Sequence, residues 1–386
     1  MKFIIKKDIL IKALSDTGKV FSMGKVAVPI LNNFKFTVEK DFIEILASNG
    51  DTTILNKLDV FDDDGNEVVS VESNGEFLIS FRITEIVKKL NGETINFELI
   101  DNSFIIISDG NSEYRLNCDR VKEYTDIDLN TSNDYIDVDI PQFIKAVSQV
   151  SFAASNKEMS NILVAINLKI KNNQLILQAT DSNRLARKII EVKSDKEVEA
   201  NIPSKTLNDV SRMCEGRQSL LISFSKERTI FKIDNLLVFS NLLTGNYPNL
   251  DTILSPKYTI DCLVNSKELI EAMGRVSLLF IDRQTAARLV ITPNEFKIIA
   301  RSPQFGSIED KINDFKFENN EFEISLDCDY IVAAIRAFNT PYVKLQFTGE
   351  VKPMYIRSDD EPNLVQVVTP LRILNWSSFK NKINTK

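Results

Sequence analysis

The hydrophobic and polar positions of the chain follow one pattern that occurs three times. Residues Tyr135–Phe152 (YIDVDIPQFIKAVSQVSF) begin with a short apolar run and continue with apolar positions at helical spacing. Similar segments form residues 1–21 and Tyr258–Phe280. In each segment a short strand precedes a helix, and the helix starts, separated by 133 and 125 residues, are Asp8, Pro141 and Ser266. This period has the length of a domain and is far longer than a solenoid repeat.

A second strand and helix follow in each repeat. These segments read FLISFRITEIVKKL, VEANIPSKTLNDVSRM and FEISLDCDYIVAAIRAF. Turn residues at Glu39-Lys40, Asn172-Asn173 and Pro293-Asn294 indicate hairpins between the two helices of each repeat. Each repeat therefore has two short helices and many antiparallel strands, which predicts an α+β fold. Three unrelated domains would not be expected to repeat the same order of elements.

We expect three repeated domains, at residues 1–131, 132–256 and 257–373, followed by a C-terminal tail at 374–386. A chain of 386 residues is longer than one hydrophobic core usually organises. The tail fits either a disordered basic segment or a helical turn beside a binding cleft, with Trp376, Phe379 and Ile383 on one face. No run approaches the ~18 apolar residues of a membrane span, and the N-terminus lacks the apolar core of a signal peptide, so we expect a cytoplasmic protein.

The amino-acid composition excludes several kinds of catalytic site. The chain has no histidine, which excludes Ser-His-Asp and Cys-His nucleophile systems and the commonest metal ligand. Its four cysteines form no Cys-x-x-Cys pair, so we expect free buried thiols, no metal and no cofactor. An enzyme that uses carboxylates or lysines stays open on composition alone. The acidic run at Asp62–Asp64, however, is followed by Gly65-Asn66 and is better explained as a turn.

Four motifs, in order along the chain, give the sequence a family resemblance. They are VPILNN at Val28–Asn33, ATDSNRLA at Ala179–Ala186, GNYPNLDTILS at Gly245–Ser255 and VVTPLRI at Val367–Ile373. Together with the threefold repeat they resemble the beta subunit of bacterial DNA polymerase III, the sliding clamp, over residues 1 to about 373. The resemblance implies three clamp domains per chain, with two chains joined head to tail in a ring around duplex DNA. Antiparallel sheets would form the outer wall and helices would line the hole.

The resemblance also implies a non-enzymatic function. Such a ring confers processivity on the replicative DNA polymerase, without a catalytic site of its own. Partners would be double-stranded DNA, polymerase subunits, the clamp loader and repair proteins. The net charge of −7 argues against an ordinary nucleic-acid binder, but a ring needs only locally basic helices and diffuse phosphate contacts. The predicted DNA-binding residues are basic side chains on the expected helices, with Lys25 and Lys157 in loops: Lys6, Lys12, Lys25, Lys88, Lys89, Lys145, Lys157, Arg212 and Arg275.

The resemblance places a partner-peptide cleft between the second and third domains. Its expected residues are Leu163, Thr180, Ser182, Asn183, Arg184, Leu185, Pro248, Thr252, Ile253, Val367, Val368, Thr369, Pro370, Leu371 and Arg372. Several of them depart from the family pattern. Thr252 stands at a commonly basic position, Thr369 at a frequent methionine, and Ser182-Asn183 at a pair that is often Gly-His or Gly-Tyr. We therefore expect a wider or wetter pocket, with a preferred peptide that differs from that of other family members.

The resemblance also places the contact between the two chains of the ring. Tyr114 and Leu116 of the first domain would meet Leu278 and Leu279 of the partner's third domain. A ring of three chains with two domains each is excluded by the three repeats in one chain. A paralogue from a phage or plasmid, serving a specialised polymerase, stays open.

Overall fold

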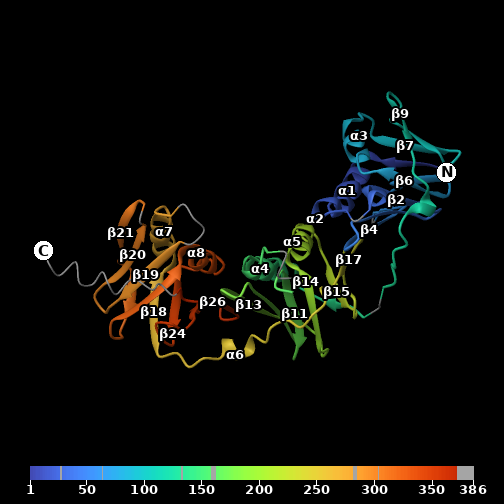
Figure 1. Ribbon diagram of the computed structural model, residues 1–386. Coiled ribbons are helices and arrows are strands. Elements are labelled where there is room, and N and C mark those ends of the chain that lie inside the picture. The colour runs from blue at the N-terminus through green and yellow to red at the C-terminus, as the bar shows by residue number, and fades with distance from the viewer. Residues whose placement is uncertain are drawn as a thin grey trace. The chain divides into compact units, whose positions relative to one another are not determined.

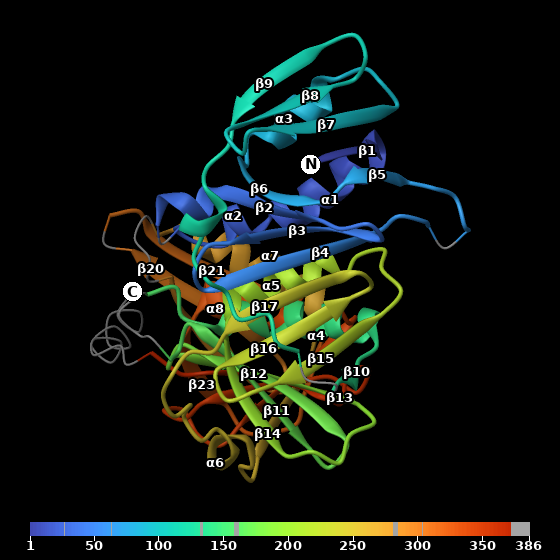
Figure 2. The same ribbon diagram turned by 90° about the vertical axis from the view of Figure 1, so that its right-hand side faces the viewer.

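The structure is a computed structural model that describes residues 1–26, 28–62, 64–131, 134–157, 162–280, 285–302 and 304–371. The chain divides into two compact units. The first unit comprises residues 1–144, 192–194 and 205–243, and the second comprises 145–191, 195–204 and 244–386. Figures 1 and 2 show the elements of each unit. Arg372 and the tail lie outside the described residues.

The first unit contains two antiparallel sheets. Their strand orders are β5-β1-β7-β8-β9 and β10-β15-β16-β17-β4-β3-β2-β6. The strands are β1 Lys2–Lys6, β2 Asn33–Val38, β3 Phe42–Ser48, β4 Thr52–Asp59, β5 Val69–Ser73, β6 Gly75–Ser80, β7 Thr94–Ile100, β8 Phe104–Ser108, β9 Glu113–Asn117, β10 Ile136–Asp137, β15 Leu220–Phe224, β16 Arg228–Ile233 and β17 Leu236–Asn241. The helices are α1 Lys7–Gly18, α2 Val20–Met23, α3 Ile83–Lys89 and α5 Ser204–Met213, with short 3-10 turns at Pro29–Asn32 and Val121–Glu123.

The second unit also contains two antiparallel sheets. Their strand orders are β14-β11-β12-β13-β26-β25-β24-β18-β22 and β21-β20-β19-β23. The strands are β11 Ala165–Lys171, β12 Gln174–Thr180, β13 Arg184–Glu191, β14 Val198–Pro203, β18 Ile260–Asn265, β19 Ala286–Ile291, β20 Phe296–Ser302, β21 Gly306–Ile312, β22 Phe315–Phe317, β23 Phe322–Asp327, β24 Tyr342–Phe347, β25 Met354–Arg357 and β26 Leu364–Val368. The helices are α4 Ile140–Val150, which begins in the first unit, α6 Asp251–Leu254, α7 Ser266–Ser277 and α8 Cys328–Arg336, with a 3-10 turn at Ser151–Ala153.

Two strand pairs join successive repeats into continuous sheets. In the first unit β4 pairs with β17, and Thr52 lies opposite Ser240. In the second unit β13 pairs with β26, and Arg184 lies opposite Val368. The middle repeat therefore supplies strands to both units, because β15–β17 continue the sheet of the first repeat and β11–β14 continue that of the third.

Local signals explain where the helices begin. The Asn265 side chain accepts a hydrogen bond from the backbone N–H of Glu268 at 3.0 Å and caps α7. Asp327 caps α8 by accepting from the N–H groups of Asp329 and Tyr330. Helices α7 and α8 pack side by side (Figure 1), and their apolar faces are buried.

The predicted α+β class, the two helices per repeat and the hairpins are confirmed. The acidic run is a turn, as expected, in which the Asp62 carboxylate accepts from the N–H groups of Asp64 and Asn66. The prediction that Lys6 lies on a helix is wrong. Lys6 ends β1, where it pairs with Thr94, and α1 begins one residue later. Basic and apolar residues alternate through the end of β1 and the start of α1, so the sequence pattern does not show where the strand ends and the helix begins.

Candidate functional site

The candidate cleft is built around the turn between β12 and β13. One oxygen of the Asp181 carboxylate, Oδ1, accepts hydrogen bonds from the backbone N–H groups of Asn183 at 2.9 Å and Arg184 at 3.0 Å. Ser182 has a φ of 77°, a left-handed conformation that is uncommon for a residue other than glycine. The Thr180 hydroxyl donates to the Arg184 carbonyl at 2.7 Å. These bonds fix the shape of the ATDSNR segment.

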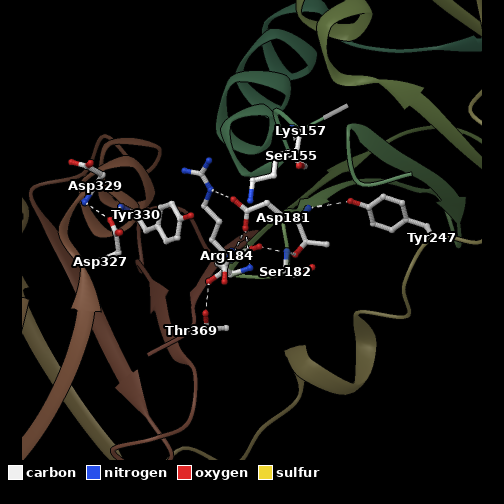
Figure 3. Close-up of polar contacts among 12 residues, drawn as sticks. Ser155, Lys157, Asp181, Ser182, Arg184, Tyr247, Asp327, Asp329, Tyr330 and Thr369 are labelled. Atoms are coloured by element: carbon white, nitrogen blue, oxygen red, sulfur yellow. Dashed lines mark hydrogen bonds and ion pairs between the residues drawn. The ribbon is translucent and has the colours of Figure 1, made fainter. Parts of the chain in front are cut away.

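Arg184 forms a rigid wall beside this turn. Its Nε donates to Asp181 Oδ2 at 2.9 Å, and its guanidinium centre lies 4.6 Å from the ring centroid of Tyr330 and 5.5 Å from that of Phe152. Figure 3 shows Arg184 between Asp181 and the Tyr330 ring. Burial raises the pKa of Tyr330, and the nearby Asp181 charge acts in the same direction. The arginine is thus held by an ion pair and by cation–π contacts, which leave little rotamer freedom.

Residues that follow β26 close the turn from the side of the third repeat. Both the backbone N–H and the hydroxyl of Thr369 donate to the carbonyl of Asn183, at 2.9 Å and 2.8 Å (Figure 3). The N–H of Leu371 donates to the Ser325 carbonyl at 2.8 Å. Thr369 therefore serves as a hydrogen-bonding anchor, and its hydroxyl is already occupied.

The segment Tyr247–Leu254, which we call the second linker, is tied to both repeats. The Tyr247 hydroxyl accepts from the N–H of Thr180 at 3.1 Å (Figure 3), and burial raises the pKa of this phenol to about 12. Arg187 donates to the Asp251 carboxylate at 2.7 Å. The Tyr355 hydroxyl donates to the Ile253 carbonyl at 2.7 Å. The linker is therefore part of the site's framework.

The expected cleft residues separate into a buried framework and an accessible surface. The buried residues are Thr180, Leu185, Val367 and Val368. The exposed or half-buried residues are Leu163, Ser182, Asn183, Arg184, Pro248, Thr252, Ile253, Thr369, Pro370 and Leu371. Arg372 falls outside the described residues. Only the second group offers surface to a ligand.

Sequence reasoning missed Tyr330, Phe152 and Tyr355. Tyr330 lies in the first turn of α8, three residues after the capping Asp327, and it contacts Arg184 across a separation of 146 residues. The only local signal was an aromatic residue at a half-buried helix position. No local pattern connects it with the turn between β12 and β13.

The predicted DNA-binding residues are mostly exposed. Lys12, Lys88, Lys89, Lys145, Arg212 and Arg275 lie on helices, whereas Lys25 and Lys157 lie in loops. Lys6 is half-buried.

Several of these cations already have an acidic partner. Arg275 lies 2.6 Å from Asp310, Lys88 lies 2.9 Å from Glu85, and Arg212 lies 3.1 Å from Asp209. Lys145 pairs with Glu361. The other predicted cations form no ion pair with any residue that the structure describes: Lys6, Lys12, Lys25, Lys89 and Lys157.

Each unit has an open strand edge next to exposed apolar side chains. In the described part of the chain β9 pairs with β8 alone, and Tyr114 on β9 is 37% exposed, with Leu116 half-buried. In the second unit β21 pairs with β20 alone, and Leu278, which follows α7, is 84% exposed, with Leu279 half-buried. Unpaired edges of this kind favour pairing with another chain.

The described residues contain no arrangement suited to catalysis by thiols or metals. Burial raises the pKa of Cys214, Cys262 and Cys328 to about 12, so these thiols stay protonated at neutral pH. No group of three His, Cys, Asp or Glu side chains could hold a metal ion in the part of the chain that is described. Within the same residues, no helix is long and apolar enough to cross a membrane.

Comparisons with known proteins agree with this architecture. The N-terminal, central and C-terminal domain models of the DNA polymerase III beta subunit match residues 1–128, 137–249 and 252–372. The chain is 30% identical to the beta sliding clamp of Bacillus subtilis over 378 residues, which cover 96% of this chain and 100% of that one. It is 26% identical to a Staphylococcus aureus beta sliding clamp over 96% of this chain and 99% of that one.

Solved structures are similar along the whole chain. The DNA polymerase sliding clamp from Bacillus subtilis has a TM-score of 0.90 at 29% identity, with 97% of this chain and 99% of that one covered. A DNA polymerase III subunit beta from Pseudomonas aeruginosa, at 17% identity, has a TM-score of 0.89, with 97% and 100% covered, and shares the fold. The chain has three beta-clamp domains and belongs to the family of bacterial DNA polymerase III beta subunits, the sliding clamps, which act in DNA replication as processivity factors and not as enzymes.

Proposed function

We propose that two copies of this chain form a closed ring around duplex DNA and hold the replicative polymerase on its template. The observation that carries this proposal is that two of the edge strands, β9 in the first unit and β21 in the second, lie beside exposed apolar residues. A head-to-tail contact uses β9 of one copy and β21 of the other. Two such contacts close a ring of two chains. We set its three domains at residues 1–131, 132–256 and 257–373.

The proposed interface combines backbone pairing with apolar burial. The free N–H and C=O groups of β9 and β21 pair as antiparallel strands, which removes both edges. Tyr114 and Leu116 of one copy then pack against Leu278 and Leu279 of the other. The large exposed fraction of Leu278 makes it the main apolar contributor, because it has the most surface to bury.

DNA contact in this ring is electrostatic and independent of sequence. The cations without an acidic partner, above all Lys12, Lys25, Lys89 and Lys157, are those most able to contact phosphates. The paired cations Lys88, Lys145, Arg212 and Arg275 contribute less, since their charge is offset. A ring retains DNA by closure, so weak phosphate contacts are sufficient and permit sliding.

Partner proteins bind, in this proposal, through short peptides at the cleft around Arg184. Leu163, Ile253, Pro370 and Leu371 supply partly exposed apolar surface, and Ile253 is 39% exposed. The fixed Arg184 side chain and the exposed Ser182-Asn183 backbone supply polar contacts. Polymerase subunits, the clamp loader and repair proteins are the expected partners. Replication of chromosomal DNA would place the protein in the cytoplasm.

The ring is tested by charging its interface. The double variant Leu278→Asp, Leu279→Asp should sediment as a monomer and should fail to stay on nicked circular DNA after loading. Val351→Asp is the matched control, because Val351 is also apolar and is 77% exposed but lies in the turn before β25. A double variant that sediments as a dimer would overturn the proposed interface, and a wild-type chain that sediments as a monomer would overturn the ring.

A further inference from the structure

The turn between β3 and β4 in the first unit repeats the hydrogen bonds of the cleft turn in the second. Asn49 Oδ1 accepts from the N–H groups of Asp51 at 3.0 Å and Thr52 at 2.9 Å. The Asp181 carboxylate makes the same two bonds to the residues two and three positions after it. Asn49 and Asp181 therefore occupy equivalent positions.

The correspondence extends to the rest of the turn. The Ser48 hydroxyl donates to the Thr52 carbonyl at 3.2 Å, as the Thr180 hydroxyl does to the Arg184 carbonyl. Gly50, like Ser182, has a positive φ, of 102°.

The following repeat also closes both turns in the same way. The N–H of Asn241 donates to the Asp51 carbonyl at 2.9 Å, and the N–H of Thr369 donates to the Asn183 carbonyl at the same distance. Asn241 follows Ser240 of β17, and Thr369 follows Val368 of β26, the residues that lie opposite Thr52 and Arg184. The first unit thus contains the framework of the proposed cleft.

A cavity of about 630 Å³ lies at this turn, and we call it the first-unit cavity. It is lined by the turn, by residues 125–131 and by parts of β15, β16 and β17. Leu31, Ile127, Ile230 and Phe239 give it apolar walls. Its size is in the range of ordinary ligand pockets and suits one or two side chains of a peptide.

The charges around the first-unit cavity differ from those of the cleft. Asp51, Asp126 and Glu227 line it, are exposed, and form no ion pair with any described residue. Arg228 does not offset them, because its guanidinium donates to the Asp128 carboxylate and to the Asn130 carbonyl. Thr52, which is buried, stands where the cleft has Arg184. Lys226 also lines the cavity and is exposed, so three unpaired carboxylates stand beside one lysine and the rim is acidic on balance.

We propose that the first-unit cavity is a second docking site, which receives a short peptide of a partner protein with an apolar anchor flanked by lysine or arginine. The apolar walls take the anchor, and the three unpaired carboxylates select the basic flanks. The inference rests on the shared turn and on the cavity. It does not depend on ring closure or on peptide binding at the cleft.

The test uses the full-length chain and a defined probe. A fluorescein-labelled peptide with Leu and Phe anchors between pairs of lysines is titrated by anisotropy, beside the same peptide with glutamates. The lysine peptide should bind, and Asp126→Lys, Glu227→Lys should weaken it by about tenfold or more. Asp41→Lys, Glu44→Lys, at acidic positions on and next to β3, is the matched control and should leave binding unchanged. Equal binding of the lysine and glutamate peptides, or no binding, would overturn the proposal.

A crosslink locates the bound peptide independently of affinity. A benzophenone placed at the Phe position should label residues 125–131 or 223–230 of the wild-type chain. Labelling confined to 248–253 or 369–371 would assign the peptide to the cleft of the second unit and would overturn the proposal. Ile253→Asp should leave binding of the lysine peptide unchanged, because Ile253 belongs to that cleft.

Discussion

Each of the two linkers between successive repeats is held by an arginine. One arginine belongs to the repeat that follows its linker, and the other belongs to the repeat that precedes its linker. We call Tyr124–Thr131 the first linker. Its Asp128 is bonded by Arg228 of β16, which belongs to the following repeat. In the second linker, Asp251 is bonded by Arg187 of β13, which belongs to the preceding repeat. Asp128 and Asp251 each lie four residues after a linker tyrosine, so the same acidic position is anchored to different neighbours.

The difference shows how one backbone framework acquires two kinds of surface. In the second unit Arg184 lines the turn, stacks against Tyr330 and is paired with Asp181. In the first unit the equivalent position is a buried threonine, and Arg228, which lines the cavity, holds the linker. The same framework therefore carries an ion pair beside one site and leaves unpaired carboxylates around the other.

We expect the largest loss of stability from replacing the side chains whose oxygen atoms accept the hydrogen bonds of the two turns. Asp181→Ala removes the acceptor of three hydrogen bonds and leaves the Arg184 guanidinium, whose side chain is 16% exposed, without its partner. We expect a loss of about 2–4 kcal/mol in the free energy of unfolding of the second unit. Asn49→Ala removes three neutral bonds, two accepted from Asp51 and Thr52 and one donated to the Val20 carbonyl, and should cost about 1–2 kcal/mol in the first unit. Urea denaturation measures both.

Hydrogen exchange at residues 183–184 and 51–52 checks that each loss is local. Equal losses in the free energy of unfolding would contradict the expected difference between the two turns. They would mean that the charge of Asp181 and its ion pair with Arg184 add nothing to the stability that the hydrogen bonds provide.

A smaller and selective effect is expected from the linker arginines. Arg228→Ala removes bonds to Asp128 and Asn130, so amides 125–131 should exchange about tenfold faster, in line with a loss of about 1.4 kcal/mol. Amides 248–254 should not change. Arg187→Ala should do the reverse, because it frees Asp251. If either variant speeds hydrogen exchange in both linkers, the two arginine anchors are not independent.

The smallest effect concerns two carboxylates whose pKa values shift in opposite directions. Burial raises the pKa of Glu361, but the ammonium groups of Lys145 and Lys188 outweigh burial and hold that pKa below its ordinary value. This stabilises the second unit above about pH 4.3 and is lost as the pH falls through the lower folded-state pKa. In the first unit, burial raises the pKa of Asp209 against the opposing charges of Arg212, Lys205 and Lys19. Its ionisation therefore costs stability as the pH rises through the raised pKa.

Urea midpoints between pH 3.5 and 7 test this pair. In the Glu361→Gln variant, the urea midpoint should fall less steeply as the pH is lowered than it does in the wild-type chain. Asp209→Asn should stabilise the first unit at pH 7 and should lose that advantage as the pH falls and the Asp209 carboxyl of the wild-type chain becomes protonated. A destabilised Asp209→Asn at pH 7 would mean that its contact with Arg212 outweighs the cost of burial.

Features that depend on neighbouring residues were predictable from the sequence, and features that depend on distant ones were not. Apolar spacing located the helices at Lys7–Gly18, Ile140–Val150 and Ser266–Ser277, and turn residues located the hairpins. Nothing local indicated that β4 would pair with β17, because this pairing joins residues at least 180 positions apart. The same limit explains the unexpected partner of Lys145, since Glu361 lies 216 residues away.

In the candidate site, too, the features set by neighbouring residues were predictable and those set by distant residues were not. The motif ATDSNRLA identified the turn because its bonds lie within four residues. Tyr330 was missed because its contact with Arg184 exists only after β13 pairs with β26.

The continuous sheets have a consequence for modularity. The segment that recurs in the sequence is not the segment that packs as one body, since the middle repeat gives half of its strands to each unit. A repeat excised at its sequence boundaries would expose the edge of β4 or of β13 and would tend to aggregate. Gene fusions, truncations and split reporters should therefore cut between the two strand groups of the middle repeat.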